Sequence, residues 1–299
     1  MIVYLDQNKW IELARISNGK QSSERDKKIL TEFRTLAKNG VSFPLASTHY
    51  IEFSRIKDPE RRRRLGSTMW ELSKGISLAP YTKIVEWEIE SGLEKVGIDV
   101  EKTDVNLLGK GIEFAFGVSK EKVRSDFEHE MISRIVLTGC DMFNMDPIYS
   151  GIFAKQRINF LNHLEELQVK KKLLPKSQWD DWLYAITMVD IIEPMDRVFC
   201  AQGLDKSIFE YRSKEYITRF LNAMPTRILD VHLHRQVLKN DQYRPKETDL
   251  EDWGGIGVAS CYCDVVVCEK HFANMLGRDK YKPTARIVTR LDDVIECAV

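Results

Sequence analysis

The chain has 299 residues, of which 43% are hydrophobic and 30% charged, and its formal net charge is zero. This length suits one large domain or two modest ones, and the apolar content can build a real core. The balanced charge excludes nucleic-acid binding through an overall basic field, so such contact would need a local basic patch or a metal ion. Six cysteines without a CxxC pair, no signal peptide and no stretch that could span a membrane predict a cytoplasmic protein with reduced thiols.

The first part of the chain alternates short apolar runs with helical patterns. IVYL predicts a strand and QNKWIELARI a helix. Residues 22–38 predict a second helix that starts at a serine cap and ends at Asn39-Gly40. VSFPLAS predicts a second strand, followed by the helical THYIEFSRI with its cap at Ser47 or Thr48. GISLAP is a third strand candidate, and YTKIVEWEIESGL predicts the next helix.

The middle of the chain, residues 97–222, is predicted to be mostly helical. SKEKVRSDFEHEMISRIVL, INFLNHLEELQVKKKLL, WDDWLYAITMVDII and KEYITRFLNAM all have amphipathic helical spacing. Strand patterns return at DVVVC and ARIVT, with the short helix KHFANML between them. Strands that alternate with helices indicate a mostly parallel sheet. We therefore expect an α/β domain built from residues 1–96 and 223–299, with a large all-helical insertion between its two parts.

Acidic residues stand beside several predicted strand-to-helix junctions. They are Asp6, Glu52, Asp249, Asp252, Asp264 and Glu269. Ligand sites in open parallel sheets collect at the carboxyl ends of the strands, so four or five of these carboxylates can converge on one edge. Such a cluster is unfavourable without a cation, and oxygen ligands favour Mg²⁺ or Mn²⁺ over zinc. Two such ions about 4 Å apart could activate a water and stabilise the leaving oxygen in phosphodiester cleavage.

Three stretches together resemble the PIN-domain nucleases: IVYLDQN, PLASTHYIEFSR and TDLEDWGGIGVASCYCDVVVCEKHFANML. In that family an apolar strand ends in Asp-x-Asn or Asp-x-Ser, and a helix after the second strand carries a Glu. A later helix opens with Asp, and a short strand then leads to another acid and a Phe. Asp6 and Asn8 match the first acid and its polar neighbour, and Glu52 matches the second acid. Asp249 or Asp252 matches the third, with Asp252 at the better spacing.

The fourth acidic position of the resemblance stays open between Asp264 and Glu269, and Lys270 stands where the family often has an acid. The resemblance covers roughly residues 1–95 and 225–290. It implies a PIN-like, metal-dependent endonuclease that holds Mg²⁺ or Mn²⁺ and cuts RNA in preference to DNA. It assigns catalysis to Asp6, Glu52, Asp252 and Asp264, and metal binding to these with Asp249 and Glu269. Bacterial relatives of this kind often act as toxins or defence effectors.

The strongest local basic patch is RRRR, Arg61 to Arg64. It has two interpretations: a solvated helix face, or a group that grips the phosphates of a substrate near the acids. The substrate-binding residues predicted on the second interpretation are Asn8, Arg61, Arg62, Arg63, Arg64 and Lys270. Membrane partners are not expected, whereas the helical insertion could recognise substrate, form a homo-oligomer or bind an inhibitor protein.

Two other functions compete with the metal-dependent nuclease. Lys270 favours an inactive PIN-like scaffold, whose helical block binds a partner and whose acids no longer hold metal. Read singly, Asp6 is a helix cap, and Asp249 and Asp252 are acids at a helix start. A metal-independent HEPN-type ribonuclease is the third hypothesis, because RSDFEH (124–129) and RILDVH (227–232) both have the Arg-x4-His spacing of that class.

Overall fold

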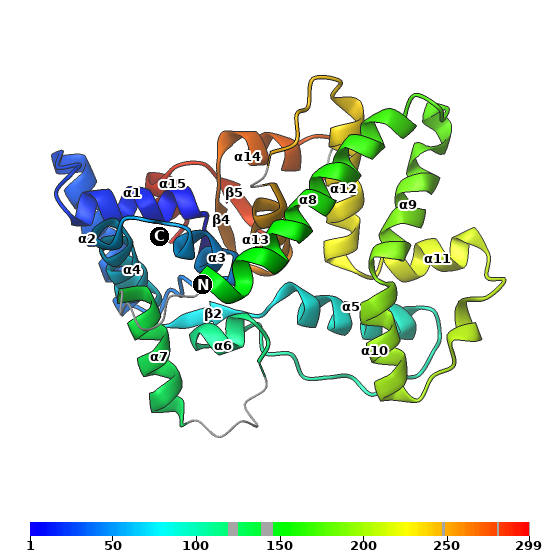
Figure 1. The fold of residues 1–299 in the computed structure, drawn as a ribbon, viewed down its shortest axis with the longest axis horizontal. Helices are drawn as coiled ribbons and strands as arrows, with labels where there is room; N and C mark the ends of the chain where they lie inside the picture. Colours follow the sequence, from blue (N-terminus) through cyan, green and yellow to red (C-terminus); the bar gives the residue numbers. More distant parts are fainter. Residues whose placement is uncertain (119–124, 139–145, 247–248, 280, 299) are drawn as a thin grey trace.

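The structure is a computed structural model that describes residues 1–118, 125–138, 146–246, 249–279 and 281–298. Helices surround a small parallel sheet, so the predicted mixture of α and β elements is confirmed (Figure 1). Within these ranges, no helix combines the length and the apolar character that crossing a bilayer requires.

The central sheet joins the two ends of the chain. Its strands run parallel in the order β1 (Val3–Leu5), β4 (Val265–Val267) and β5 (Arg286–Val288). A separate antiparallel pair consists of β2 (Ile76–Leu78) and β3 (Leu108–Lys110), of which β3 was not predicted. All residues of β1 and β4 are buried. Burial on both faces explains why these strands are continuous apolar runs without alternation.

The predicted second strand, VSFPLAS, does not form a regular strand, so this prediction is wrong. The segment lies beside β1 and makes isolated parallel bridges, Ser42 to Ile2 on one side and Leu45 to Ser77 on the other. Pro44 lies between the bridging residues and has no N–H for a ladder. The segment therefore occupies a strand position between β1 and β2 without continuous pairing.

Among the described residues, nine helices of the first and last parts of the chain pack around these strands. They are α1 (Gln7–Ser17), α2 (Glu24–Lys38), α3 (Ser47–Ser54), α4 (Pro59–Ser73), α5 (Tyr81–Lys95), α12 (Pro225–Lys239), α13 (Asp249–Tyr262), α14 (Lys270–Leu276) and α15 (Leu291–Cys297). The serine cap of α2 is Ser23, which forms a capping box with Asp26. The cap of α3 was predicted one or two residues too late, because its N-cap is Ala46.

The described residues of the middle part form helices joined by loops, with β3 as their one strand. Its helices are α6 (Gly111–Ala115), α7 (Asp126–Thr138), α8 (Asp146–Lys170), α9 (Trp179–Asp190), α10 (Ile192–Gln202) and α11 (Lys214–Leu221), with short 3-10 turns at Lys176–Gln178 and Lys206–Phe209. α10 and α11 share an apolar core with α5, whereas α8 and α9 share one with α12. α8 runs diagonally across the molecule (Figure 1). The middle helices therefore pack closely on the helices that flank them.

Candidate functional site

Two acids lie at the carboxyl edge of the central sheet. Asp6 directly follows β1, and Glu269 lies just beyond β4; these strands are parallel and in register. The Asp6 backbone N–H donates to the Val267 carbonyl at 2.9 Å. The Asn8 amide donates to Oε1 of Glu269 at 2.5 Å. Sequence positions more than 260 residues apart thus meet at one edge, as the parallel arrangement predicts.

Asp6 is both a helix cap and part of this edge. Its Oδ1 accepts the Gln7 N–H of α1 at 2.7 Å, and its side chain is buried. The pKa of Asp6 is raised to about 6: burial is the largest cause, the charge of Glu269 adds to the increase, and the Gln7 N–H and Lys9 act in the opposite direction. A cap in solvent has a lowered pKa, because the helix N–H groups favour the carboxylate. Capping alone does not account for this environment.

Glu52 on α3 and Asp252 on α13 are the other two acids brought together here. Burial raises the pKa of Glu52 to about 9, with Asp252 and Asp6 as the next largest causes. Burial also raises the pKa of Asp252 to about 8, with Asp6 as the next cause. Glu52 therefore lies in the field of Asp6 and Asp252, and Asp252 lies in that of Asp6 and Glu269. These charges and the burial favour the protonated forms of Glu52 and Asp252. We call Asp6, Glu52, Asp252 and Glu269 the acidic cluster.

His49 fixes two members of the acidic cluster relative to each other. Its Nδ1 accepts the Ala46 N–H at 2.9 Å, and its Nε2–H donates to the Leu5 carbonyl at 2.8 Å. Burial lowers the pKa of His49 to about 4, so the ring stays neutral and keeps both bonds. The ring thereby connects the residue before Asp6 with the start of the helix that carries Glu52. The sequence analysis missed this residue.

A glycine allows α13 to approach the sheet. A Cβ at Gly255 would lie 2.2 Å from the Tyr4 hydroxyl oxygen and 2.8 Å from Oγ1 of Thr48. No side chain larger than hydrogen fits there without movement. Gly255 follows Asp252 by three residues, about one helical turn. The close approach therefore helps to hold Asp252 near β1 and α3.

Glu251 is a buried acid beside the acidic cluster that the sequence analysis did not select. It forms ion pairs with Arg55, which follows α3, and with Arg157 of α8. Its side chain is only 4% exposed, so the two arginines compensate a charge that solvent does not reach. The helical middle of the chain thus contributes to the support of the site. No local pattern pairs Glu251 with Arg157, because 94 residues separate them.

Asp264, predicted as catalytic, is not brought to this edge. It lies at the amino end of β4, where it is exposed and its Oδ2 accepts the Ile2 N–H at 2.6 Å. Four residues of extended chain separate it from Cys268 at the other end, a distance of about 13 Å. The structure therefore places Glu269, and not Asp264, with Asp6.

Asp249 and Lys270 lie close to the acidic cluster in the chain. Oδ2 of Asp249 accepts the Tyr243 hydroxyl at 2.6 Å and the Lys246 N–H at 2.9 Å, so this carboxylate organises the start of α13. Its charge nevertheless contributes to the raised pKa of Asp252. Lys270 is exposed at the first position of α14, immediately after Glu269.

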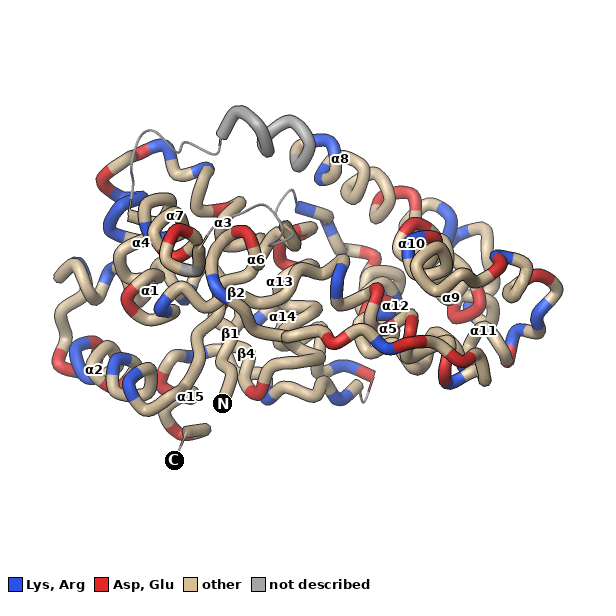
Figure 2. The backbone as a smooth tube through the Cα atoms, turned by 90° about the horizontal axis from the view of Figure 1, so that it is seen from below, with Lys and Arg blue, Asp and Glu red and all other residues tan. Residues whose placement is uncertain are grey.

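The arginine run lies on α4, where Figure 2 shows basic residues gathered. Arg63 and Arg64 form ion pairs with Glu60 one turn earlier. Arg62 donates to a backbone carbonyl that precedes the helix. Arg61 lines a pocket between α1 and α4. The four arginines therefore have different environments and do not form one continuous gripping surface.

The two Arg-x4-His patterns give no site in the described residues. Arg124 lies outside them, so RSDFEH cannot be examined. In α12, five residues rotate the helix by about 140°, so Arg227 and His232 diverge. Arg227 stacks over the Tyr81 ring at 5.1 Å, whereas His232 donates to the Met275 carbonyl at 2.8 Å.

The chemistry of the acidic cluster fits a hard divalent cation, although its side chains are not arranged as ligands. In the described part of the chain, no three His, Cys, Asp or Glu side chains are grouped to hold one ion. The carboxylates interact electrostatically over longer distances, and a cation would offset the repulsion that raises their pKa values. Carboxylate oxygens suit Mg²⁺ and Mn²⁺. Binding would require Glu52 and Asp252 to lose their protons and turn toward the ion.

Comparisons with known proteins do not identify the chain. No protein-family model matches it, and neither a curated protein nor a solved structure does so. The inference of function therefore depends on the motifs and on the geometry of the acidic cluster.

Proposed function

We propose that the chain is a PIN-like, metal-dependent endonuclease that cleaves phosphodiester bonds, with RNA as the favoured substrate. The observation that carries the proposal is the acidic cluster, in which four carboxylates from separate parts of the chain gather at one edge of a parallel sheet. Three of them have raised pKa values. Buried acids in one another's field destabilise the fold, and such arrangements are concentrated at functional sites. The preference for RNA comes from the family resemblance.

The roles follow from the positions of the residues. Asp6, Glu52, Asp252 and Glu269 would hold Mg²⁺ or Mn²⁺, which when bound would activate water and stabilise the leaving oxygen. Asn8 fixes the orientation of Glu269 through its hydrogen bond. His49 and Gly255 are positioning residues, because they hold the elements that carry the acids.

The test uses single-stranded RNA and DNA with Mg²⁺, Mn²⁺ or EDTA, and compares the wild type with Asp6→Asn. We expect cleavage of RNA with either metal ion, no cleavage in EDTA, and loss of cleavage in the variant. Asn retains an oxygen that can cap α1, so a loss reports the charge of Asp6 more than folding. Cleavage that survives both EDTA and Asp6→Asn would refute the proposal and favour the HEPN-type mechanism.

The second candidate is an inactive PIN-like scaffold. It is favoured by the absence, among the described residues, of three side chains grouped as ligands of one ion. Calorimetric titration with Mg²⁺ separates the two candidates. A scaffold would neither cleave RNA nor bind Mg²⁺, whereas the proposed nuclease binds Mg²⁺ and releases protons as Glu52 and Asp252 ionise.

A further inference from the structure

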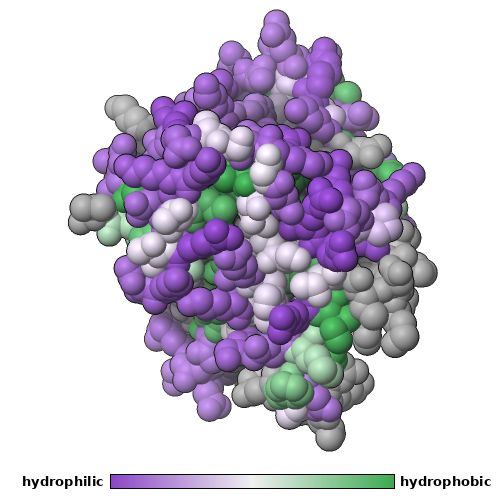
Figure 3. Space-filling model, turned by 90° about the vertical axis from the view of Figure 1, so that its left-hand side faces the viewer, coloured by the Kyte–Doolittle hydropathy of each residue, from purple (hydrophilic) through white to green (hydrophobic). Residues whose placement is uncertain are grey.

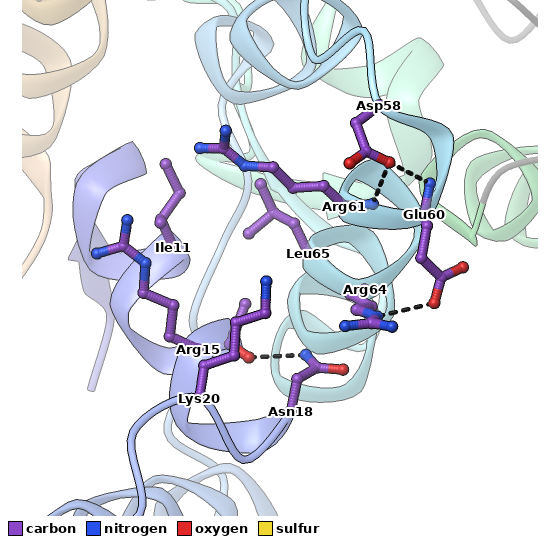
Figure 4. Close-up of a pocket in the computed structure, with 10 residues that line it drawn as sticks. Ile11, Arg15, Asn18, Lys20, Asp58, Glu60, Arg61, Arg64 and Leu65 are labelled. Carbon is purple, nitrogen blue, oxygen red and sulfur yellow. Dashed lines mark hydrogen bonds and ion pairs between the residues drawn. The ribbon is translucent and has the colours of Figure 1, made fainter.

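A pocket of about 280 Å³ lies between α1 and α4, apart from the acidic cluster (Figure 4). Its apolar lining comes from Ile11, Ala14 and Leu65. Its basic lining comes from both sides: Arg15 and Lys20 from α1 and the turn after it, and Arg61 and Arg64 from α4. Figure 4 shows Arg61 extending from α4 across the space toward α1. The surrounding end of the molecule is mostly hydrophilic, with small apolar patches (Figure 3).

The acids that line the pocket are already engaged. Oδ1 of Asp58 accepts two backbone N–H groups at the start of α4, at 2.9 and 3.1 Å. Glu60 is paired with Arg64 and with the neighbouring Arg63. Both carboxylates are therefore bound within their own helix.

Three cations of the pocket lack such partners. Within the described ranges, no hydrogen bond or ion pair holds the side chain of Arg15, Lys20 or Arg61. Arg15 also lies in the last turn of α1, where the carbonyl end of the helix favours positive charge. Three cations facing one pocket repel one another, and an anion in the pocket would offset that repulsion. The planar guanidinium groups of two arginines match the oxygens of a phosphate.

The pocket is connected to the acidic cluster along one face of α1. Asn8, Ile11 and Arg15 are spaced by three and four residues, so they lie on the same face of the helix. Asn8 binds Glu269 of the acidic cluster, and the other two residues line the pocket. Nine residues separate Asp6 from Arg15, a distance of about 14 Å along the helix. A stacked strand advances about 3.4 Å along its axis per nucleotide, so this distance corresponds to an axial advance of about four nucleotides.

We propose that the α1–α4 pocket binds a backbone phosphate of the nucleic-acid strand whose scissile phosphate lies at the acidic cluster. The inference rests on the proposed nuclease function for the identity of its ligand. It assigns phosphate binding to Arg15, Lys20 and Arg61, and it excludes Arg63, whose guanidinium is engaged by Glu60. The basic run thus contributes through Arg61 at one of its ends, together with Arg15 of α1 and Lys20 of the turn after it.

The test measures binding of a fluorescein-labelled single-stranded RNA in EDTA, so that the RNA stays intact. Arg61→Ala and Lys20→Ala are compared with Arg63→Ala, which removes the same charge from the same helix as Arg61→Ala. We expect the first two variants to weaken affinity about three- to tenfold. The slope of log K against log salt should fall by about 0.7 in each. Arg63→Ala should change the affinity by less than about twofold.

Three results would overturn the proposal. Equal losses of RNA affinity in Arg61→Ala and Arg63→Ala would indicate a general field of positive charge. Wild-type RNA affinity in both Arg61→Ala and Lys20→Ala would show that the pocket does not bind the RNA. AMP serves as a second probe, since a free nucleotide presents the same phosphate chemistry. If AMP displaces the labelled RNA at concentrations as low as unlabelled RNA does, the pocket is assigned to a free nucleotide.

The same variants separate this proposal from the nuclease function. Asp6→Asn should bind RNA in EDTA at least as tightly as the wild type, because the pocket does not include Asp6 and the substitution removes an acid that would repel the scissile phosphate. Loss of cleavage in Asp6→Asn with unchanged RNA binding by Arg61→Ala would refute the pocket and leave the nuclease intact. If Arg61→Ala binds RNA more weakly and the wild type cleaves no RNA, phosphate binding by the pocket is supported and the nuclease function is refuted.

Discussion

The two edges of the central sheet place similar residues in opposite environments. At the amino edge, Asp264 is exposed and binds one backbone N–H of the neighbouring strand. At the carboxyl edge, Asp6 likewise binds one backbone N–H, but it is buried among other acids and the pKa is raised. Both aspartates flank three-residue apolar strands that pair with each other. The difference shows that the neighbours at an edge, and not the local motif, decide whether an acid is structural or a candidate for chemistry.

The sharpest test of this comparison substitutes one acid at each edge. Asp252→Asn should reduce metal-dependent RNA cleavage by at least about 100-fold, because it removes a carboxylate that would bind the metal ion. Asp264→Asn is the matched control and should retain activity within about twofold, since Asn can still accept the Ile2 N–H. Initial rates at saturating Mg²⁺ measure both. Equal losses in the two variants would contradict the division between the edges.

Much of the carboxyl edge could be predicted from the sequence, because it depends on local signals. The apolar run before Asp6 and the helical pattern after it gave the right elements, and parallel strands bring their carboxyl ends together. The choice between Asp264 and Glu269 could not be settled from the motif, since both flank the same short strand. It follows from the direction and register in which β4 pairs with β1.

The features that the sequence did not reveal depend on tertiary contacts. His49 and the Glu251–Arg157 pair act between elements whose packing no local pattern specifies. Pro44 interrupts the apolar run VSFPLAS, which otherwise has the pattern of a strand. The run was predicted as a strand from its apolar pattern, although proline cannot donate to a strand ladder. Glu60 lies three and four residues before Arg63 and Arg64, and this helical spacing accounts for the ion pairs that engage two members of the arginine run.

A second test concerns how α13 reaches the carboxyl edge. Gly255→Ala should lower the free energy of unfolding by about 1–3 kcal/mol, because the new methyl group overlaps the Tyr4 hydroxyl at 2.2 Å. Gly254→Ala, one residue earlier in the same helix, meets only Thr48 Cγ2 at 3.7 Å. It should leave stability unchanged or raise it by up to about 1 kcal/mol through helix propensity. Urea denaturation measures both, and a destabilised Gly254→Ala beside a neutral Gly255→Ala would contradict the packing of α13.

The effect that is most specific to the electrostatics of the carboxyl edge is a pH dependence. In the unfolded chain Glu52 ionises above its ordinary pKa of 4.5, whereas in the folded protein it stays protonated until about pH 9. Stability is therefore lost progressively as the pH rises between these values. Glu52→Gln cannot ionise, so it should match the wild type near pH 4 and exceed its free energy of unfolding by up to about 5 kcal/mol near pH 8.

The control for this effect is Glu210→Gln, which removes an exposed carboxylate from the helical middle of the chain. Its difference from the wild type should not change between about pH 4 and pH 8. Mg²⁺ provides a second comparison of the wild type with Glu52→Gln. A cation bound at the acidic cluster stabilises the ionised wild type more than it stabilises the Gln variant. Saturating Mg²⁺ should therefore narrow the gap near pH 8. A gap that is the same at both pH values would show that Glu52 ionises freely, and the contrast between the two edges of the sheet would then lose its electrostatic basis.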